Sequence, residues 1–118
     1  MLTDATAVVF FNDVLAIGGL QRFSEKGIRV PEDISVIGCD DILAASFCMP
    51  PLTTLASGGE DVGRLATDML VNRLTSTARA RVVERLPVHL AVRQSTGPAP
   101  FRGDAGRGPS RVVKGQHV

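Results

Sequence analysis

Short apolar runs alternate along the chain with stretches of helical periodicity. Residues 7–11 (AVVFF) and 34–37 (ISVI) are rich in apolar and β-branched side chains, which predicts strands buried on both faces of a parallel sheet. Between them, apolar side chains recur on one helical face at Ala16, Ile17, Leu20 and Phe23. Asp13 is placed to N-cap this helix and Gly27 to end it. A helical crossover of this kind makes the two strands parallel.

The second half of the chain predicts further elements of both kinds. A short helix is expected at residues 44–47 and an extended segment at 52–55. Residues 57–60 have the S-x-x-E spacing of a capping box, and they precede an amphipathic helix. Residues 86–92 alternate apolar and polar side chains, and Pro87 confines this strand to a sheet edge. The pattern as a whole predicts an α/β fold in which a parallel sheet is flanked by helices.

Composition divides the chain near residue 97. Residues 97–118 hold five Gly, three Pro and no apolar periodicity, so we expect a disordered tail after one folded unit over residues 1–96. The folded unit carries a net charge of −2 and the tail +3. A folded unit with a net negative charge does not favour binding to the phosphates of DNA. With two Cys among 118 residues and no run of the ~20 apolar residues that would span a membrane, we expect a reduced, cytoplasmic protein without membrane contact.

Polar side chains follow both of the first two predicted strands. Asn12 and Asp13 come after the first strand, and Asp40 and Asp41 after the second. In open α/β sheets, ligands bind beyond the carboxyl ends of the parallel strands. An amide and a carboxylate there suit the hydroxyl groups of a sugar. For Asp13 the interpretation as a helix cap is favoured, whereas Asn12 and Asp40 fit a ligand site and a turn equally well.

Signals for catalysis are weak. Asp40 and Asp41 could contribute to a Mg²⁺ site, but two carboxylates are far short of an octahedral shell. Cys39 and Cys48 lie nine residues apart, which favours an apolar role, and neither His89 nor His117 has a nucleophile nearby in the sequence. We therefore expect no enzyme activity, no metal and no cofactor.

Four segments together resemble the LacI/GalR family of transcriptional regulators. Residues 12–18 (NDVLAIG) are similar to the family's N-D-x-x-A-x-G, and residues 27–41 (GIRVPEDISVIGCDD) are similar to its G-x-x-V-P-x-D-(I/V)-S-V-x-G-x-D-D. Residues 50–54 (PPLTT) and 90–96 (LAVRQST) follow in the family's order. The resemblance covers residues 7–96. It implies part of a periplasmic-binding-protein-like (type I) sensor domain.

The resemblance also implies partners. The family holds a small effector, such as a sugar or a nucleobase, in a cleft between two lobes, and its effector-contacting residues match Asn12 and Asp40. Ser57 stands where a cleft-lining Gln is common. The family forms homodimers, and the residues that match its interface regions are Val14, Leu15, Ile17, Gly18, Gln21, Ala45 and Phe47.

Other functions stay open at this point. The family binds DNA through an N-terminal helix-turn-helix, which the four segments do not include, so we expect DNA contact only through that absent part. The alternatives are a solute-binding protein for sugar uptake, which shares the fold, and a truncated product without function.

Overall fold

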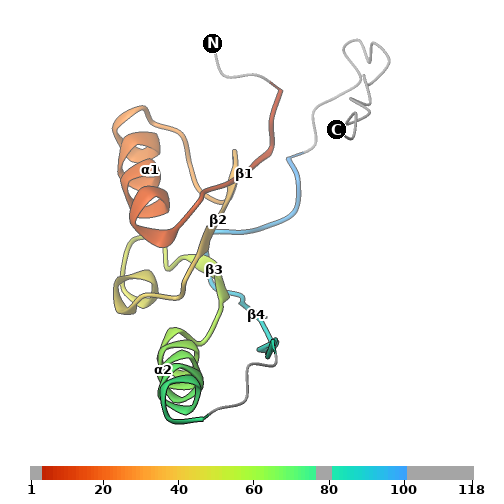
Figure 1. The fold of residues 1–118 in the computed structure, drawn as a ribbon. Coiled ribbons are helices and arrows are strands. Elements are labelled where there is room, and N and C mark those ends of the chain that lie inside the picture. Colours follow the sequence, from red (N-terminus) through yellow and green to blue (C-terminus); the bar gives the residue numbers. More distant parts are fainter. Residues whose placement is uncertain (1–3, 77–80, 101–118) are drawn as a thin grey trace, which may run out of the picture.

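A computed structural model describes residues 4–76 and 81–100, which form a four-stranded sheet with helices (Figure 1). The elements follow in the order β1 (Ala7–Val9), α1 (Asp13–Glu25), β2 (Ser35–Cys39), the 3-10 helix η1 (Leu43–Ser46), β3 (Thr53–Ala56), α2 (Gly59–Thr75) and β4 (His89–Ala91). The strands lie in the sheet in chain order. β1, β2 and β3 are parallel and β4 is antiparallel to β3, which confirms the expected α/β class.

Helix α1 packs on the sheet through the predicted face. Ala16 and Leu20 are buried, and Ile17 and Phe23 are partly buried against the same core. The helix ends in a Schellman arrangement at Gly27, whose φ of +68° suits a residue without a side chain. There the Gly27 N–H donates to the Ser24 carbonyl, and the next N–H along the chain donates to the Phe23 carbonyl. The predicted end of this helix is therefore confirmed.

The hydrophobic core lies on one face of the sheet. α1 and η1 cover the same face (Figure 1), and the core consists of Ala16, Leu20, Val36, Ala45 and Leu52. Within the described residues no helix covers the opposite face. The sequence predicted that β1 is buried on both faces, and this prediction is wrong. β1 is an edge strand with one covered face, and Val9 is 67% exposed.

The chain hydrogen-bonds to β3 along β4 and then, after β4, to β2 as well. β4 pairs with the carboxyl-terminal part of β3, at the predicted sheet edge. Beyond it, the Ser95 carbonyl accepts from the Val36 N–H of β2. The buried Ser95 hydroxyl accepts from the Thr53 N–H at 2.7 Å and donates to the Val36 carbonyl at 2.6 Å. One hydroxyl thus satisfies backbone groups of two strands where β3 begins.

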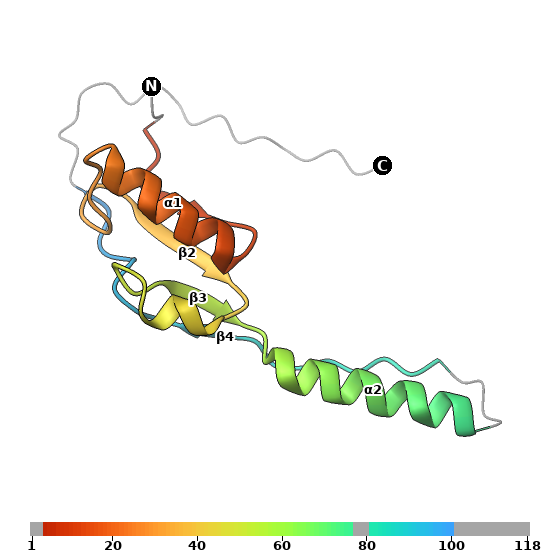
Figure 2. The ribbon, with the colours of Figure 1, turned by 90° about the vertical axis from the view of Figure 1, so that its left-hand side faces the viewer.

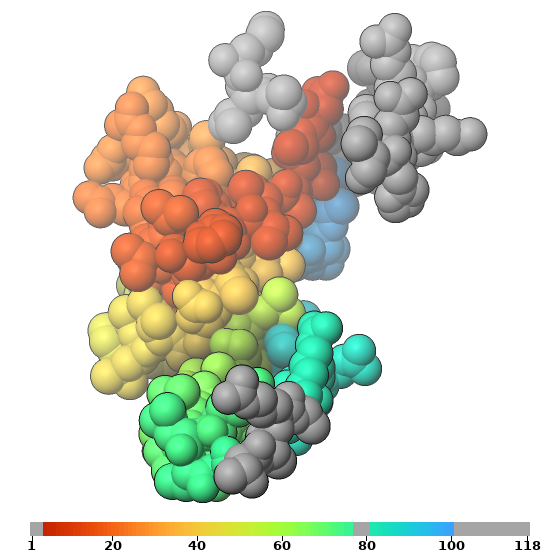
Figure 3. Space-filling view, in the orientation of Figure 1, coloured from red at the N-terminus to blue at the C-terminus, as the bar shows by residue number. Residues whose placement is uncertain are grey.

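Helix α2 extends away from the sheet. Figure 2 shows it projecting beyond β3, with the segment before β4 running back beside it, and Figure 3 shows that this part forms a separate block from α1. None of its residues is buried. The predicted capping box at residues 57–60 is wrong: the N-cap is Gly58, with a left-handed φ of 63° and no side-chain cap. An L residue rarely adopts that backbone conformation, which explains the glycine.

Close approach of two elements requires a glycine in the middle of β2. A Cβ atom at Gly38 would collide with the Asp13 carboxylate of α1 and would lie 2.9 Å from Leu52 Cδ2. Both neighbours are fully buried, so neither can move aside without disturbing the core. By contrast, nothing lies within 4 Å of a Cβ at Gly63, in the exposed helix α2.

We therefore expect opposite effects from the same substitution at these two glycines. Gly38→Ala should lower the free energy of unfolding by about 1–3 kcal/mol through overpacking. Gly63→Ala should raise it by about 0.5–1 kcal/mol, because alanine is the better helix former. Urea unfolding followed by circular dichroism measures both. Equal stability of the Gly38→Ala variant and the parent would contradict the packing described here.

Candidate effector-binding edge

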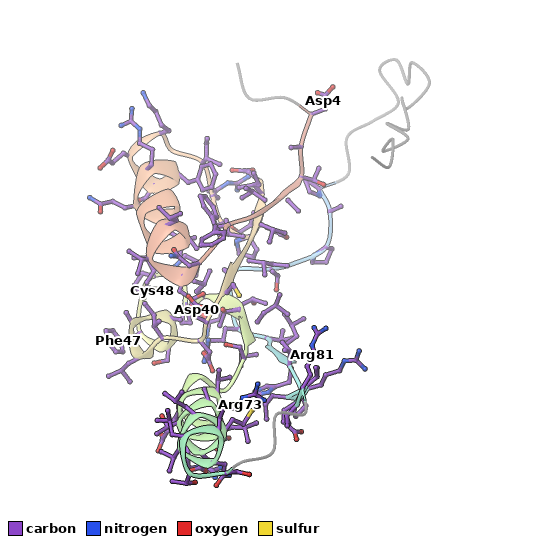
Figure 4. The ribbon with its side chains drawn as sticks, in the orientation of Figure 1. Asp4, Asp40, Phe47, Cys48, Arg73 and Arg81 are labelled. Atoms are coloured by element: carbon purple, nitrogen blue, oxygen red, sulfur yellow. The ribbon has the colours of Figure 1, made fainter. Side chains whose placement is uncertain are left out.

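Three of the residues singled out in the sequence lie at one edge of the sheet. Asn12 follows β1, Asp40 directly follows β2, and Ser57 directly follows β3. Because these strands are parallel, their carboxyl ends meet at the same edge. Asp40 is exposed there (Figure 4), and the other two side chains are partly exposed. The structure therefore brings the three candidate effector contacts to one side of the molecule.

Asn12 is the N-cap of α1, the role that the sequence pattern assigned to Asp13. Its Oδ1 accepts a hydrogen bond of 2.9 Å from the Leu15 N–H. This bond orients the side-chain amide and fixes which end of it points toward the helix. Its NH₂ group donates to no acceptor within the described residues, so it is available to a ligand at this edge.

Asp13 is fully buried and links three elements, so its assignment as a helix cap is wrong. Its Oδ1 accepts from the Thr54 hydroxyl of β3 at 2.6 Å. Its Oδ2 accepts from the Ile42 N–H, in the chain before η1, at 2.9 Å. The two hydrogen bonds satisfy both oxygens of the carboxylate in this buried place. Sequence reasoning missed this role because both partners lie far away along the chain.

The Asp40–Asp41 pair forms a turn with an unusual backbone. The φ angles are 111° at Asp40 and 54° at Asp41, a region that L residues rarely adopt. The Asp40 N–H donates to the Leu55 carbonyl at 2.9 Å, and the Asp41 N–H donates to the Thr54 hydroxyl at 3.4 Å. The Asp41 carboxylate pairs with Arg93 at 2.6 Å. The N-cap of η1 is Ile42, so Asp41 does not cap this helix.

Cys39 and His89 are two further titratable groups near this edge. Burial, and then the negative charge of the adjacent Asp40, raise the pKa of the Cys39 thiol above its usual value. A thiol with a raised pKa is a poor nucleophile at neutral pH. His89 is exposed and lies opposite Ala56, the last residue of β3. The sequence pattern predicted that His89 lies on the polar side of a strand. It did not predict that His89 lies near Ser57, at the carboxyl end of β3.

The opposite edge of the sheet carries an ion pair that is separate from this site. Arg29 and Asp33 form two side-chain bonds, of 2.7 Å and 3.0 Å, in the loop before β2. The hydrogen bonds from Arg29 lower the pKa of Asp33 to about 2. This carboxylate is thus ionised at neutral pH.

The described part of the chain shows no metal centre and no membrane span. No group of three or more His, Cys, Asp or Glu residues in residues 4–76 and 81–100 is placed to hold a metal ion. In the same ranges, no helix has the length and apolar content that crossing a membrane requires. His117 lies outside the described residues, as does most of the predicted tail. Gly97, the first residue of that tail, exchanges hydrogen bonds with Ser35.

Most of the candidate interface residues form the outer surface of α1 and η1. Val14 and Leu15 are 64% and 55% exposed, and Phe47 points outward from η1 at 65% (Figure 4). Gly18 and Gln21 are also exposed on α1, and Ile17 is partly buried. Ala45 differs from the rest, because its side chain is fully buried in the core and reaches no outer surface.

Comparisons with known proteins identify the family of the chain. Residues 2–96 match the family model of the periplasmic binding protein-like domain. The chain is 42% identical over 90 residues to the HTH-type transcriptional repressor PurR of Pasteurella multocida, a match that covers 76% of this chain and 27% of the repressor. The LacI family regulator from Enterococcus faecium with bound ribose superposes with a TM-score of 0.76 at 35% identity, over 85% of this chain and 36% of that one.

A further structure shows the same relationship. The lac repressor dimer bound to operator and the anti-inducer ONPF has a TM-score of 0.70 at 36% identity, over 77% of this chain and 32% of that one. The chain belongs to the periplasmic binding protein-like domain family. Within this family it corresponds to part of the effector-binding domain of the LacI-family transcriptional regulators. It spans about a quarter of the length of the curated relatives that it matches, which are repressors and not enzymes.

The Asp13 network gives a prediction for stability. Thr54→Val keeps the shape of the side chain but removes the hydroxyl that donates to the buried carboxylate. We expect the free energy of unfolding to fall by about 1.5–3 kcal/mol, the usual worth of a hydrogen bond to a charged group. Thr67→Val is the matched control, because that exposed hydroxyl only donates to a carbonyl of its own helix, and its effect should stay within about 0.5 kcal/mol. Similar losses in both variants, in urea unfolding, would argue against the network.

Proposed function

We propose that this chain supplies one side of the effector-binding cleft of a LacI-type transcriptional regulator. The observation that carries the proposal is the placement of Asn12, Asp40 and Ser57 beyond the carboxyl ends of three adjacent parallel strands. Ligands of open α/β sheets bind at such an edge. The named repressors among its relatives favour a regulator over a protein for sugar uptake, which was the alternative with the same fold.

The chemistry of this edge suits a small ligand with several hydroxyl groups, such as a sugar. The exposed Asp40 carboxylate accepts hydrogen bonds, the free NH₂ of Asn12 donates them, and the Ser57 hydroxyl can do either. A sugar hydroxyl both donates and accepts, so a mixed set of this kind can satisfy it completely. The ribose held by the Enterococcus faecium relative is a ligand of this type.

A binding experiment with the full chain tests the proposal. Ribose, together with a panel of other sugars and nucleobases, is screened by the thermal shift of the chain, and any ligand found is titrated by calorimetry. Asp40→Asn should weaken binding of that ligand about 10- to 100-fold, because the lost bond involves a charged acceptor. Glu25→Gln is the control, since it makes the same change of charge at the far end of α1 and should leave binding unchanged. No shift with any compound, or equal affinity of the Asp40→Asn variant, would contradict the proposal.

We further propose that the outer surface of α1 and η1 pairs two copies of the chain. Large apolar side chains lie exposed there, with Val14, Leu15, Leu43 and Phe47 all more than half exposed. Gly18 adds a position where nothing lies within 4 Å of an added Cβ, so a second backbone could approach the helix closely. The lac repressor relative is a dimer, which supports the same assembly here. DNA contact would belong to a helix-turn-helix, which is no part of the matched domain.

Val14→Glu tests this assembly. A charge placed in an apolar contact loses its hydration, so dimerisation should weaken at least about tenfold, which corresponds to about 1.4 kcal/mol. Sedimentation velocity over a range of concentrations measures the change. Val71→Glu makes the same substitution on exposed α2 and should leave the dimer intact. A parent chain that is monomeric at every concentration would overturn the proposal.

A further inference from the structure

We propose that Arg93 is a positioning residue for Asp40: it holds the neighbouring Asp41 and thereby fixes the turn that presents the Asp40 carboxylate at the effector edge. The proposal rests on the function proposed above, since it concerns the same edge. Arg93 lies beyond β4, and its hydrogen bonds go to Thr53, Leu52 and Asp41 and not to the candidate ligand side chains Asn12, Asp40 and Ser57. Its effect is therefore indirect.

The contacts of Arg93 connect three strands. Its Nη2 donates to Asp41 Oδ1 at 2.6 Å, in the turn after β2. Its Nη1 donates to the Leu52 carbonyl at 2.9 Å, in the chain just before β3. The side chains of the ion pair are only 23% and 28% exposed, so water screens this pair less than a surface pair. A planar guanidinium can make both bonds at once in a fixed geometry, which an ammonium group cannot do.

The turn needs such a restraint because its backbone is unfavourable. Two successive aspartates with positive φ persist only where the surroundings hold them. Their N–H groups and that of Ile42 bind Leu55, Thr54 and Asp13 respectively. These bonds fix the backbone on the side of the core, and the Arg93 pair fixes the side chain of Asp41 on the outer side. Without Arg93 a half-buried carboxylate lacks its cation, and we expect the turn to move toward water.

The pKa of the Cys39 thiol depends on the position of the Asp40 carboxylate, so it can be used to follow that position without an effector. The thiol directly precedes Asp40, and the charge of Asp40 is the second cause, after burial, of its raised pKa. Moving that carboxylate away therefore lowers the pKa of Cys39. Removing the positive charge of Arg93 would act in the opposite direction if it acted on the thiol directly. The sign of the change thus separates the two effects.

The experiment measures alkylation of Cys39 by iodoacetamide in the full chain, from neutral to alkaline pH, with peptide-level mass spectrometry to separate it from Cys48. The midpoint of the pH profile reports the pKa, and the plateau reports access to the thiol. Arg93→Gln should lower the midpoint, so that alkylation at neutral pH becomes about threefold faster. Asp40→Asn should lower it as well. Because Arg93 acts through Asp40, adding Arg93→Gln to Asp40→Asn should produce no further fall.

Two further variants keep the result decisive. Arg93→Lys retains the charge but not the paired bonds, so it should lower the midpoint part of the way. If the circular dichroism of Arg93→Gln shows that this variant does not fold, the direction of the midpoint change in Arg93→Lys tests the proposal instead. Arg64→Gln, in an exposed ion pair of α2, should change nothing. An unchanged or raised midpoint in the folded Arg93 variants would overturn the positioning role. A lowered midpoint in a chain that binds no effector would keep that role and reject only the proposed function.

Discussion

The buried carboxylate of Asp13 is the constraint on which this structure depends. A charged group away from water is costly unless hydrogen bonds satisfy it. Here a hydroxyl from β3 and a backbone N–H from the chain before η1 do so, and both lie on elements remote in sequence. The same carboxylate leaves no room for a side chain at Gly38 of β2. One group thus fixes how α1, β2, β3 and η1 meet, at the edge where the ligand is proposed to bind.

Much of the fold could be predicted because its signals are local. The apolar stripe of α1, the glycine at position 27 and the edge position implied by Pro87 each depend on neighbours within a few residues, and the structure has all three. The start of α2 could not be predicted in this way. Ser57 and Glu60 have the spacing of a capping box, but the left-handed conformation of Gly58 begins the helix one residue later. Spacing alone does not reveal a backbone dihedral angle.

The candidate site shows the same limit more clearly. Strand order predicted that Asn12 and Asp40 share an edge, because parallel strands end together. It could not tell which of two adjacent residues, Asn12 or Asp13, faces inward, since a single step along a helix turns the side chain by about 100°. The pairing of Asp41 with Arg93 spans 52 residues and had no signal in the local pattern. Contacts of that kind follow from the completed sheet and not from any one segment.

Helix α1 gives the proposed sensor a direct route from its ligand to its partner. Asn12, at the start of the helix, faces the effector edge, and Val14 and Leu15 begin the outer apolar surface within the same turn. The buried carboxylate between them ties this turn to β3, so the helix start and the turn at Asp40 share one hydrogen-bonded network. Under the proposed function, a ligand that contacts both Asn12 and Asp40 would act on this network where α1 begins and where β2 ends. Coupling between two sites needs an element that both of them bias. Under the proposed function, the first turn of α1 would be that element.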